Sequence, residues 1–193
     1  MNLLITKLKK NNSKLVYFIF FFYFLIGILT FTDYGISIDE KFQRLSGFYW
    51  LKYLLSFTNF DYLKEVTNLK FFSIVDYTLP SIQYSLKYSI FFDIPAALIE
   101  IIFKIEDSKK YFEIRHLFNF FIFFLSSVYF YKLLKNRFSN YNVSILGLIF
   151  YIFSPKIYGA SFYNNKDIIF LSFLVISIYY FFKAIDSLSY RNI

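Results

Sequence analysis

Two adjacent carboxylates, Asp39 and Glu40, are the first residues of the chain whose types can do chemistry. They lie a few residues beyond an apolar stretch that ends at Thr32. A carboxylate whose pKa is tuned by burial or by neighbours can serve as a general base toward a hydroxyl or an amine. The alternative is a structural role, in which Asp39 caps a helix that opens at Glu40 and both acids favour its N-terminal dipole.

A second polar group precedes the last apolar stretch and consists of Asn164, Asn165, Lys166 and Asp167. Two carboxamides, an amine and a carboxylate can together bind a phosphate and sugar hydroxyls at a lipid boundary. The alternative is a polar turn that places Asp167 in the first turn of a helix. A motif of this length often matches by chance, so both interpretations stay open.

A third group is the pair Arg115 and His116, at the start of another apolar stretch. A guanidinium stays charged and binds phosphate through forked hydrogen bonds, so Arg115 is a candidate phosphate contact. His116 is the only histidine, and one histidine without a second histidine or a cysteine makes no metal site. No cofactor is predicted with certainty, and a divalent cation stays open. The alternative for both residues is that their polar ends simply reach the membrane surface.

The composition points to a membrane protein as the setting for these groups. Hydrophobic residues make up 58% of the 193 residues and charged residues 18%, which is too apolar for an ordinary soluble domain. The net charge of +8 does not indicate nucleic-acid binding, because the basic residues lie mainly at the ends of apolar runs. The absence of cysteine excludes disulfides and a thiol nucleophile.

Four apolar stretches predict an all-α integral membrane protein with about four transmembrane helices and a large outer loop. The stretches are Leu15–Thr32, Leu117–Tyr131, Asn142–Pro155 extending toward Phe162, and Ile168–Phe182. A helix of about 15 residues covers about 22 Å, against a hydrocarbon core of about 30 Å. One of the short stretches can therefore instead be buried in a bundle or enter the membrane only part way.

The distribution of Lys and Arg predicts the orientation, because cytoplasmic loops carry an excess of basic residues. It places residues 1–14 in the cytoplasm, 15–32 in the first span, 33–114 outside and 115–193 in the remaining spans. The C-terminus is then cytoplasmic, and the three polar groups share the outer face. The first stretch fits a retained anchor better than a signal peptide, because no small-residue cleavage pattern follows it.

Two segments of the outer loop, Phe42–Phe57 and Ile94–Ile105, have apolar residues at helical spacing. They predict amphipathic helices at the membrane surface, with Tyr49, Trp50 and Tyr53 at headgroup level. The alternative is that these helices pack on the outer ends of the spans.

The order of these features resembles the GT-C superfamily of membrane glycosyltransferases, especially the protein O-mannosyltransferases and the lipid A aminoarabinose transferases. The matching residues are Asp39 and Glu40 in GISIDEKFQR, the stretch Tyr84–Phe103, the run that begins RHLFNFF, and the phrase SPKIYGASFYNNKD. In bacterial members a phrase similar to the last one precedes a span, and this chain has Asn165 where proline is expected.

The resemblance implies transfer of a sugar from a polyprenyl-phosphate carrier to an acceptor on the outer face, with inversion at the anomeric carbon. Asp39 would be the general base, and Glu40 would help to position it or a donor group. The candidate contacts for the carrier phosphate and its sugar are Arg115, Asn165, Lys166 and Asp167. The expected location is a bacterial inner or plasma membrane, and the expected partners are membrane lipid and the polyprenyl-phosphate donor.

Members of the superfamily run to several hundred residues with many more spans, so we expect this chain to be incomplete. A missing C-terminal portion or a partner subunit would supply the rest. The competing function is a non-enzymatic assembly or docking subunit in envelope biogenesis, in which the loop carboxylates tolerate substitution. A transporter fits less well, because the spans hold no internal charge and almost no Pro or Gly interruptions.

Overall fold

A computed structural model of the chain describes residues 2–74, 90–138 and 140–191, and every regular element in these ranges is a helix. This confirms the predicted all-α class. In chain order the elements are α1 (Asn2–Thr30), the short 3₁₀ helix η1 (Phe31–Asp33), α2 (Ile38–Ser56), α3 (Asp61–Ile74), α5 (Ile90–Ile102), α6 (Ser108–Arg137), α7 (Tyr141–Phe153), α8 (Pro155–Tyr163) and α9 (Asp167–Arg191).

Three segments of the described chain are long and apolar enough to cross a membrane, namely Lys14–Asp33, Ser108–Arg137 and Asp167–Leu188. The helices α7 and α8 pass the same test together, with a bend of 54° between them, and give a fourth span if they count as one. The predicted multi-pass architecture with about four spans is thus confirmed.

The second span is longer than the sequence predicted. Helix α6 has 30 residues. At the rise of an α-helix this corresponds to about 45 Å, so the apolar run Leu117–Tyr131 is only its central part. The helix begins earlier because Asp107 caps it, accepting a hydrogen bond at 2.9 Å from the backbone N–H of Lys109. Its first turns bury Tyr111, Phe112 and Arg115 against other helices.

The third apolar stretch is broken at Ser154. Pro155 is the first residue of α8, where its missing N–H and fixed φ are tolerated. Helix α7 alone has 13 residues. Its length of about 20 Å is too short to cross a hydrocarbon core of about 30 Å. The bent pair is either one broken span or a re-entrant segment, so the alternative of partial entry stays open.

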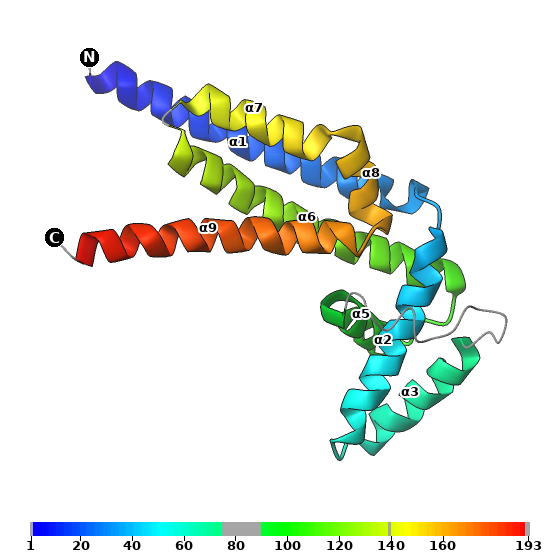
Figure 1. Cartoon of the computed structure of the whole chain (residues 1–193). Coiled ribbons are helices and arrows are strands. Elements are labelled where there is room, and N and C mark those ends of the chain that lie inside the picture. Colours follow the sequence, from blue (N-terminus) through cyan, green and yellow to red (C-terminus); the bar gives the residue numbers. More distant parts are fainter. Residues whose placement is uncertain (1, 75–89, 139, 192–193) are drawn as a thin grey trace.

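The helices form two groups (Figure 1). Helices α1, α6, α7, α8 and α9 gather in one group, the long-helix group, and both chain termini lie at its far end. Helices α2, α3 and α5 gather beyond its opposite end. The described helices that follow the first span, α2, α3 and α5, therefore lie at the end of the molecule away from the termini.

Aromatic side chains fill the core of the long-helix group. Tyr23 of α1, Phe120 of α6 and Phe162 of α8 are at most 1% exposed. The rings of Phe120 and Phe162 stack with their centroids 5.2 Å apart. This stacking fixes the end of α8 against α6 near the point where the two groups of helices meet.

Helix α2 begins at Ile38, with Ser37 as its N-cap residue. The carboxylate of Glu40 accepts a hydrogen bond from the backbone N–H of Ser37 at 2.6 Å, which is one half of a capping box. The predicted helix start is confirmed, and both acids lie in its first turn, but the N-cap residue is Ser37 and not Asp39. Ser37 takes that place because it lies three residues before Glu40, the spacing that a capping box needs.

The second predicted loop helix exists as α5, but it begins at Ile90 and ends at Ile102, with Pro95 inside it. Residues 84–89 of the stretch that carries the resemblance lie outside the described residues. The buried face of α5 includes Asp93, Ala96, Ala97 and Glu100, at the i, i+3, i+4, i+7 spacing of one helix side. Helix α2 packs on this helix. Both helices also contact the start of α6, through Glu40 with His116 and Asp93 with Arg115. The alternative of packing on the end of a span is therefore confirmed, and the place of these helices at the membrane surface stays a prediction.

The contact between α2 and α5 predicts a strong effect of Gly47→Ala. A Cβ at Gly47 would lie 2.4 Å from the carbonyl oxygen of Asp93, closer than real Cβ atoms come to backbone. The helices must move apart, so we expect a loss of about 1–3 kcal/mol of stability. Thermal unfolding in detergent measures it. Gly35→Ala is the matched control, because a Cβ there meets nothing within 4 Å, and an equal melting temperature for both variants would contradict the close approach.

Candidate functional site

The first turns of α6 carry three buried polar side chains, Arg115, His116 and Asn119. They are 2%, 1% and 0% exposed, although they belong to a helix that is apolar enough to cross a membrane. Arg115 and Asn119 share one face because they are four residues apart, and His116 lies about 100° further round. Each residue can therefore hold a different neighbouring element.

His116 holds the start of α2. Its Nε2 lies 2.8 Å from Oε1 of Glu40, and Glu40 is 2% exposed. The second carboxylate oxygen of Glu40 accepts from the N–H of Ser37. Both oxygens of this buried carboxylate are thus engaged, one by α6 and one by the backbone that precedes α2. Glu40 fixes the first turn of α2 against the long-helix group.

Arg115 binds Asp93 of α5, and Asp93 in turn binds the turn before α9. Its Nη2 donates to Oδ1 of Asp93 at 2.8 Å, and Asn165 donates its Nδ2 to the same oxygen at 3.0 Å. The three residues are at most 3% exposed. Asn165 belongs to the turn just before α9, so a single oxygen of Asp93 connects three parts of the chain.

The burial of Asp93 changes its acidity. Desolvation raises the pKa of Asp93 to about 7, and the charge and hydrogen bonds of Arg115 and Asn165 only partly offset this rise. Its carboxyl group is therefore partly protonated at neutral pH, even though an arginine lies 2.8 Å away.

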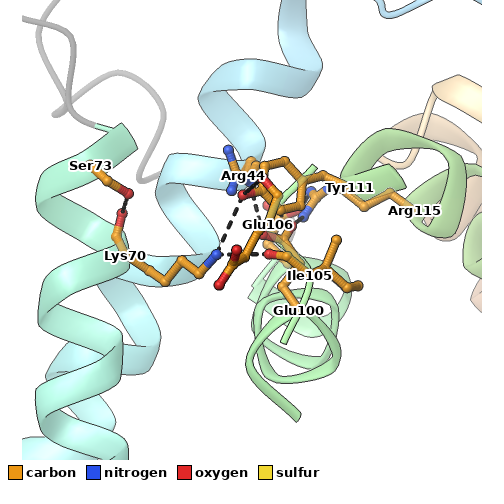
Figure 2. A network of polar contacts seen from close by, with 9 residues as sticks. Arg44, Lys70, Ser73, Glu100, Ile105, Glu106, Tyr111 and Arg115 are labelled. Carbon is orange, nitrogen blue, oxygen red and sulfur yellow. Dashed lines mark hydrogen bonds and ion pairs between the residues drawn. The ribbon is translucent and has the colours of Figure 1, made fainter. Parts of the chain in front are cut away.

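A second ion pair joins Arg44 of α2 to Glu100 of α5 (Figure 2). The buried polar cluster consists of Glu40, Arg44, Asp93, Glu100, Arg115, His116, Asn119 and Asn165. Nε of Arg44 lies 2.9 Å from Oε2 and 3.2 Å from Oε1 of Glu100. The guanidinium carbon of Arg44 also lies 3.7 Å from the centre of the Tyr111 ring, a cation–π distance. Nη1 of Arg115 lies 4.0 Å from Glu100, so Glu100 stands between two arginines.

Lys70 extends these contacts to α3, as Figure 2 also shows. Its amine donates to the carbonyl oxygen of Ile105 at 2.7 Å and lies 3.4 Å from the hydroxyl of Tyr111. The hydroxyl of Tyr111 donates to the carbonyl oxygen of Glu106 at 2.7 Å. The segment between α5 and α6 is thereby held against α3.

Four of the residues singled out in the sequence, Glu40, Arg115, His116 and Asn165, lie in this buried cluster. Asp39 is exposed next to Glu40. Lys166 is half-buried and Asp167 is exposed, both next to Asn165.

Asp167 also forms the polar turn that the sequence left open. Asn164 and Asp167 exchange two hydrogen bonds of 3.0 Å, and Asp167 is the first residue of α9. Asp167 therefore begins a helix and also lies next to the buried polar cluster.

Sequence reasoning missed Arg44, Asp93, Glu100 and Asn119 as members of the cluster. A signal existed for two of them, since Asp93 and Glu100 are seven residues apart in the otherwise apolar run IFFDIPAALIEII and must share one helix face. Charges on the apolar face of a helix indicate buried partners. Asn119 donates to the carbonyl oxygen of Phe162 at 3.2 Å, which ties the end of α8 to the same turns of α6.

Among the residues that the structure describes, no group of three or more His, Cys, Asp or Glu side chains is placed to hold a metal ion. Several buried polar atoms of the cluster have no hydrogen-bond partner within the described chain, among them Oδ2 of Asp93, Nε of Arg115 and Nδ1 of His116. The cluster therefore contains more buried donor and acceptor atoms than its hydrogen bonds pair.

Comparison with known proteins gives a match to a family model. A family model described as dolichyl-phosphate-mannose-protein mannosyltransferase covers residues 94–192, half of the chain, including most of α5 and all of α6 to α9. No curated protein and no solved structure matches the chain. The matched part contains Glu100, Arg115, His116 and Asn165 of the cluster, and the chain belongs to the dolichyl-phosphate-mannose-protein mannosyltransferase family, within the GT-C superfamily of membrane glycosyltransferases.

Proposed function

We propose that this chain transfers a sugar from a polyprenyl-phosphate donor to an acceptor on the outer face of the membrane, with inversion at the anomeric carbon. The observation that carries the proposal is the placement of Asp39. This residue is exposed on the first turn of α2, and the next residue, Glu40, anchors that turn through two contacts of 2.6 and 2.8 Å. An accessible base on an immobilised turn suits general base catalysis.

In the proposed reaction the acceptor oxygen or nitrogen attacks the anomeric carbon of the sugar. The bond between that carbon and the phosphate oxygen breaks, and polyprenyl phosphate leaves. Asp39 takes the proton from the acceptor. Inversion requires the base and the leaving phosphate to lie on opposite faces of the sugar, and a cation beside the phosphate stabilises the charge that develops there.

We assign the phosphate and sugar contacts to the turn before α9. Lys166 supplies the cation, and Asp167 is exposed and can accept hydrogen bonds from sugar hydroxyls. Arg115 and Asn165, also candidates for these contacts, are buried and bonded to Asp93. In this proposal they act by holding the turn in place.

The proposed orientation puts both termini in the cytoplasm and the α2, α3 and α5 group outside, in a bacterial inner or plasma membrane. The charge pattern supports it, since Lys132, Lys135 and Arg137 lie at the end of α6 near the termini, and basic residues favour the cytoplasmic side.

The experiment that tests the function is sugar transfer in lipid nanodiscs with a defined donor. Polyprenyl-phosphate-linked mannose, labelled in the sugar, is offered beside the same sugar as a nucleotide diphosphate donor. We expect label in an acceptor only from the lipid-linked donor, with release of polyprenyl phosphate. Transfer from the nucleotide donor alone would contradict the proposed donor class, and labelled transfer that survives Asp39→Asn unchanged would contradict the proposed base.

A further inference from the structure

We infer that Asp93 is a positioning residue, which sets the turn bearing Lys166 and Asp167 relative to the turn bearing Asp39. The inference rests on the proposed function for its catalytic meaning, but its structural content is independent of it. Asp93 lies on α5 and acts through its bonds to Asn165 and Arg115.

A series of buried polar contacts connects the two turns. Arg115 and His116 are adjacent on α6, and they reach different parts of the site. His116 bonds Glu40, next to Asp39. Arg115 bonds Asp93, which bonds Asn165, next to Lys166. Within the described part of the chain, these contacts link α2 through α6 and α5 to the turn before α9.

The residues that make these contacts are buried. Asp93 is 0% exposed, Arg115 2% and Asn165 3%, so no water competes freely for these hydrogen bonds. In such surroundings a charge-assisted bond strongly favours one geometry, because a misplaced partner leaves a buried charge unpaired. These buried bonds therefore fix the turn before α9 relative to α5 and α6. Exposed ion pairs of the same length contribute little to stability.

Helix α2 also approaches Asp93 closely. Only glycine at position 47 allows α2 to pass against the backbone of Asp93, where an added Cβ would lie 2.4 Å from its carbonyl oxygen. The backbone of Asp93 thus supports α2 directly while its side chain supports the turn before α9. Asp93 therefore fixes both the turn that bears Asp39 and the turn that bears Lys166, and so determines the distance between them.

The test measures that separation and the reaction in the same protein. The chain has no cysteine, so Lys41→Cys on α2 and Phe170→Cys on α9 give two unique sites for spin labels, both exposed. Each variant is studied in this double-cysteine chain in nanodiscs, by the distance between the labels and by kcat and KM for the lipid-linked mannose donor. The double-cysteine chain without any further substitution should give one narrow distribution of label-to-label distances.

Asp93→Asn keeps the shape and removes the charge. We expect it to broaden the distance distribution and to lower kcat by roughly ten- to a hundredfold, with a smaller change in KM, because small misplacements of reacting groups have large effects on rate. Asn165→Ala leaves the Arg115–Asp93 pair intact and removes only the link to the turn. It should broaden the distribution as well, and it keeps the test valid if Asp93→Asn does not fold.

Glu100→Gln is the matched control. It removes a carboxylate of similar burial from the same face of α5. Glu100 is bonded to Arg44 and lies 4.0 Å from Nη1 of Arg115, but it is not bonded to Asn165, and glutamine keeps an oxygen beside both arginines. It should keep the narrow distribution. The inference is overturned if both Asp93→Asn and Asn165→Ala leave the distance distribution and kcat unchanged. It is also overturned if Glu100→Gln broadens the distribution as much as they do. If the double-cysteine chain without further substitution transfers no sugar, the proposed function fails. The distances between the spin labels still decide whether Asp93 positions the two turns.

Discussion

Replacing Asp39 by asparagine is expected to lower kcat for sugar transfer by about 10²- to 10⁴-fold, the range in which a positioned general base contributes. The side chain keeps its size and loses the ability to accept the acceptor's proton. Asp39 is exposed. The stability of the protein should therefore change by no more than about 0.5 kcal/mol. Single-turnover transfer at saturating lipid-linked donor measures the loss directly.

The control for this variant is Asp61→Asn, which removes another exposed carboxylate in the α2, α3 and α5 group. The Asp61 side chain is 90% exposed and pairs with Lys64 on the same helix at 3.5 Å. Its kcat should match that of the unchanged protein. Equal activity of Asp39→Asn and the unchanged protein would exclude Asp39 as the base. Absence of transfer by the unchanged protein would favour the competing function of a docking subunit.

Replacing Arg115 by methionine is expected to cost about 3–5 kcal/mol of stability, the usual effect of removing one partner from a buried ion pair. The variant leaves Asp93 without its cation and Glu100 with Arg44 as its remaining ion-pair partner among the described residues. Methionine keeps an unbranched apolar stem, so lost packing contributes little. Thermal and denaturant unfolding in detergent give the difference.

The size of this loss should depend on pH in a definite direction. Burial raises the pKa of Asp93 to about 7, above its value in the unfolded chain, so the folded state binds more protons between these two values. The contribution of Asp93 to stability is then largest at low pH and is lost as the pH rises through about 7. Without Arg115 the pKa of Asp93 rises further, and the cost of Arg115→Met should be larger at pH 8 than at pH 6.

Lys109→Met on the same helix is the control for Arg115→Met. The Lys109 side chain is 74% exposed and lies 3.4 Å from Glu113. Its loss should cost about 0.5 kcal/mol or less at both pH values, as for other exposed ion pairs. A cost of Arg115→Met no larger than that of Lys109→Met would show that the ion pair with Asp93 does not stabilise the fold.

The sequence by itself determined the class of this protein. Long apolar runs flanked by basic residues form helices in a bilayer, because a helix pairs each backbone polar group within its own segment. The acidic pair at Asp39 and Glu40, the residues Arg115 and His116, and the turn at Asn165 were visible as polar groups at the ends of such runs. Their types and places were enough to predict a site at one end of the bundle, and the family match agrees with the class of enzyme that the resemblance indicated.

Only the tertiary structure decided which of these polar groups are buried and which stay exposed. Adjacent residues such as Asp39 and Glu40 look equivalent in the sequence, yet they point about 100° apart on a helix, so Glu40 faces α6 and Asp39 is exposed. A similar division separates buried Asn165 from half-buried Lys166. The pairing of Arg115 with Asp93 depends on how α5 packs on α6, and that long-range contact is fixed by side-chain packing that no local pattern contains.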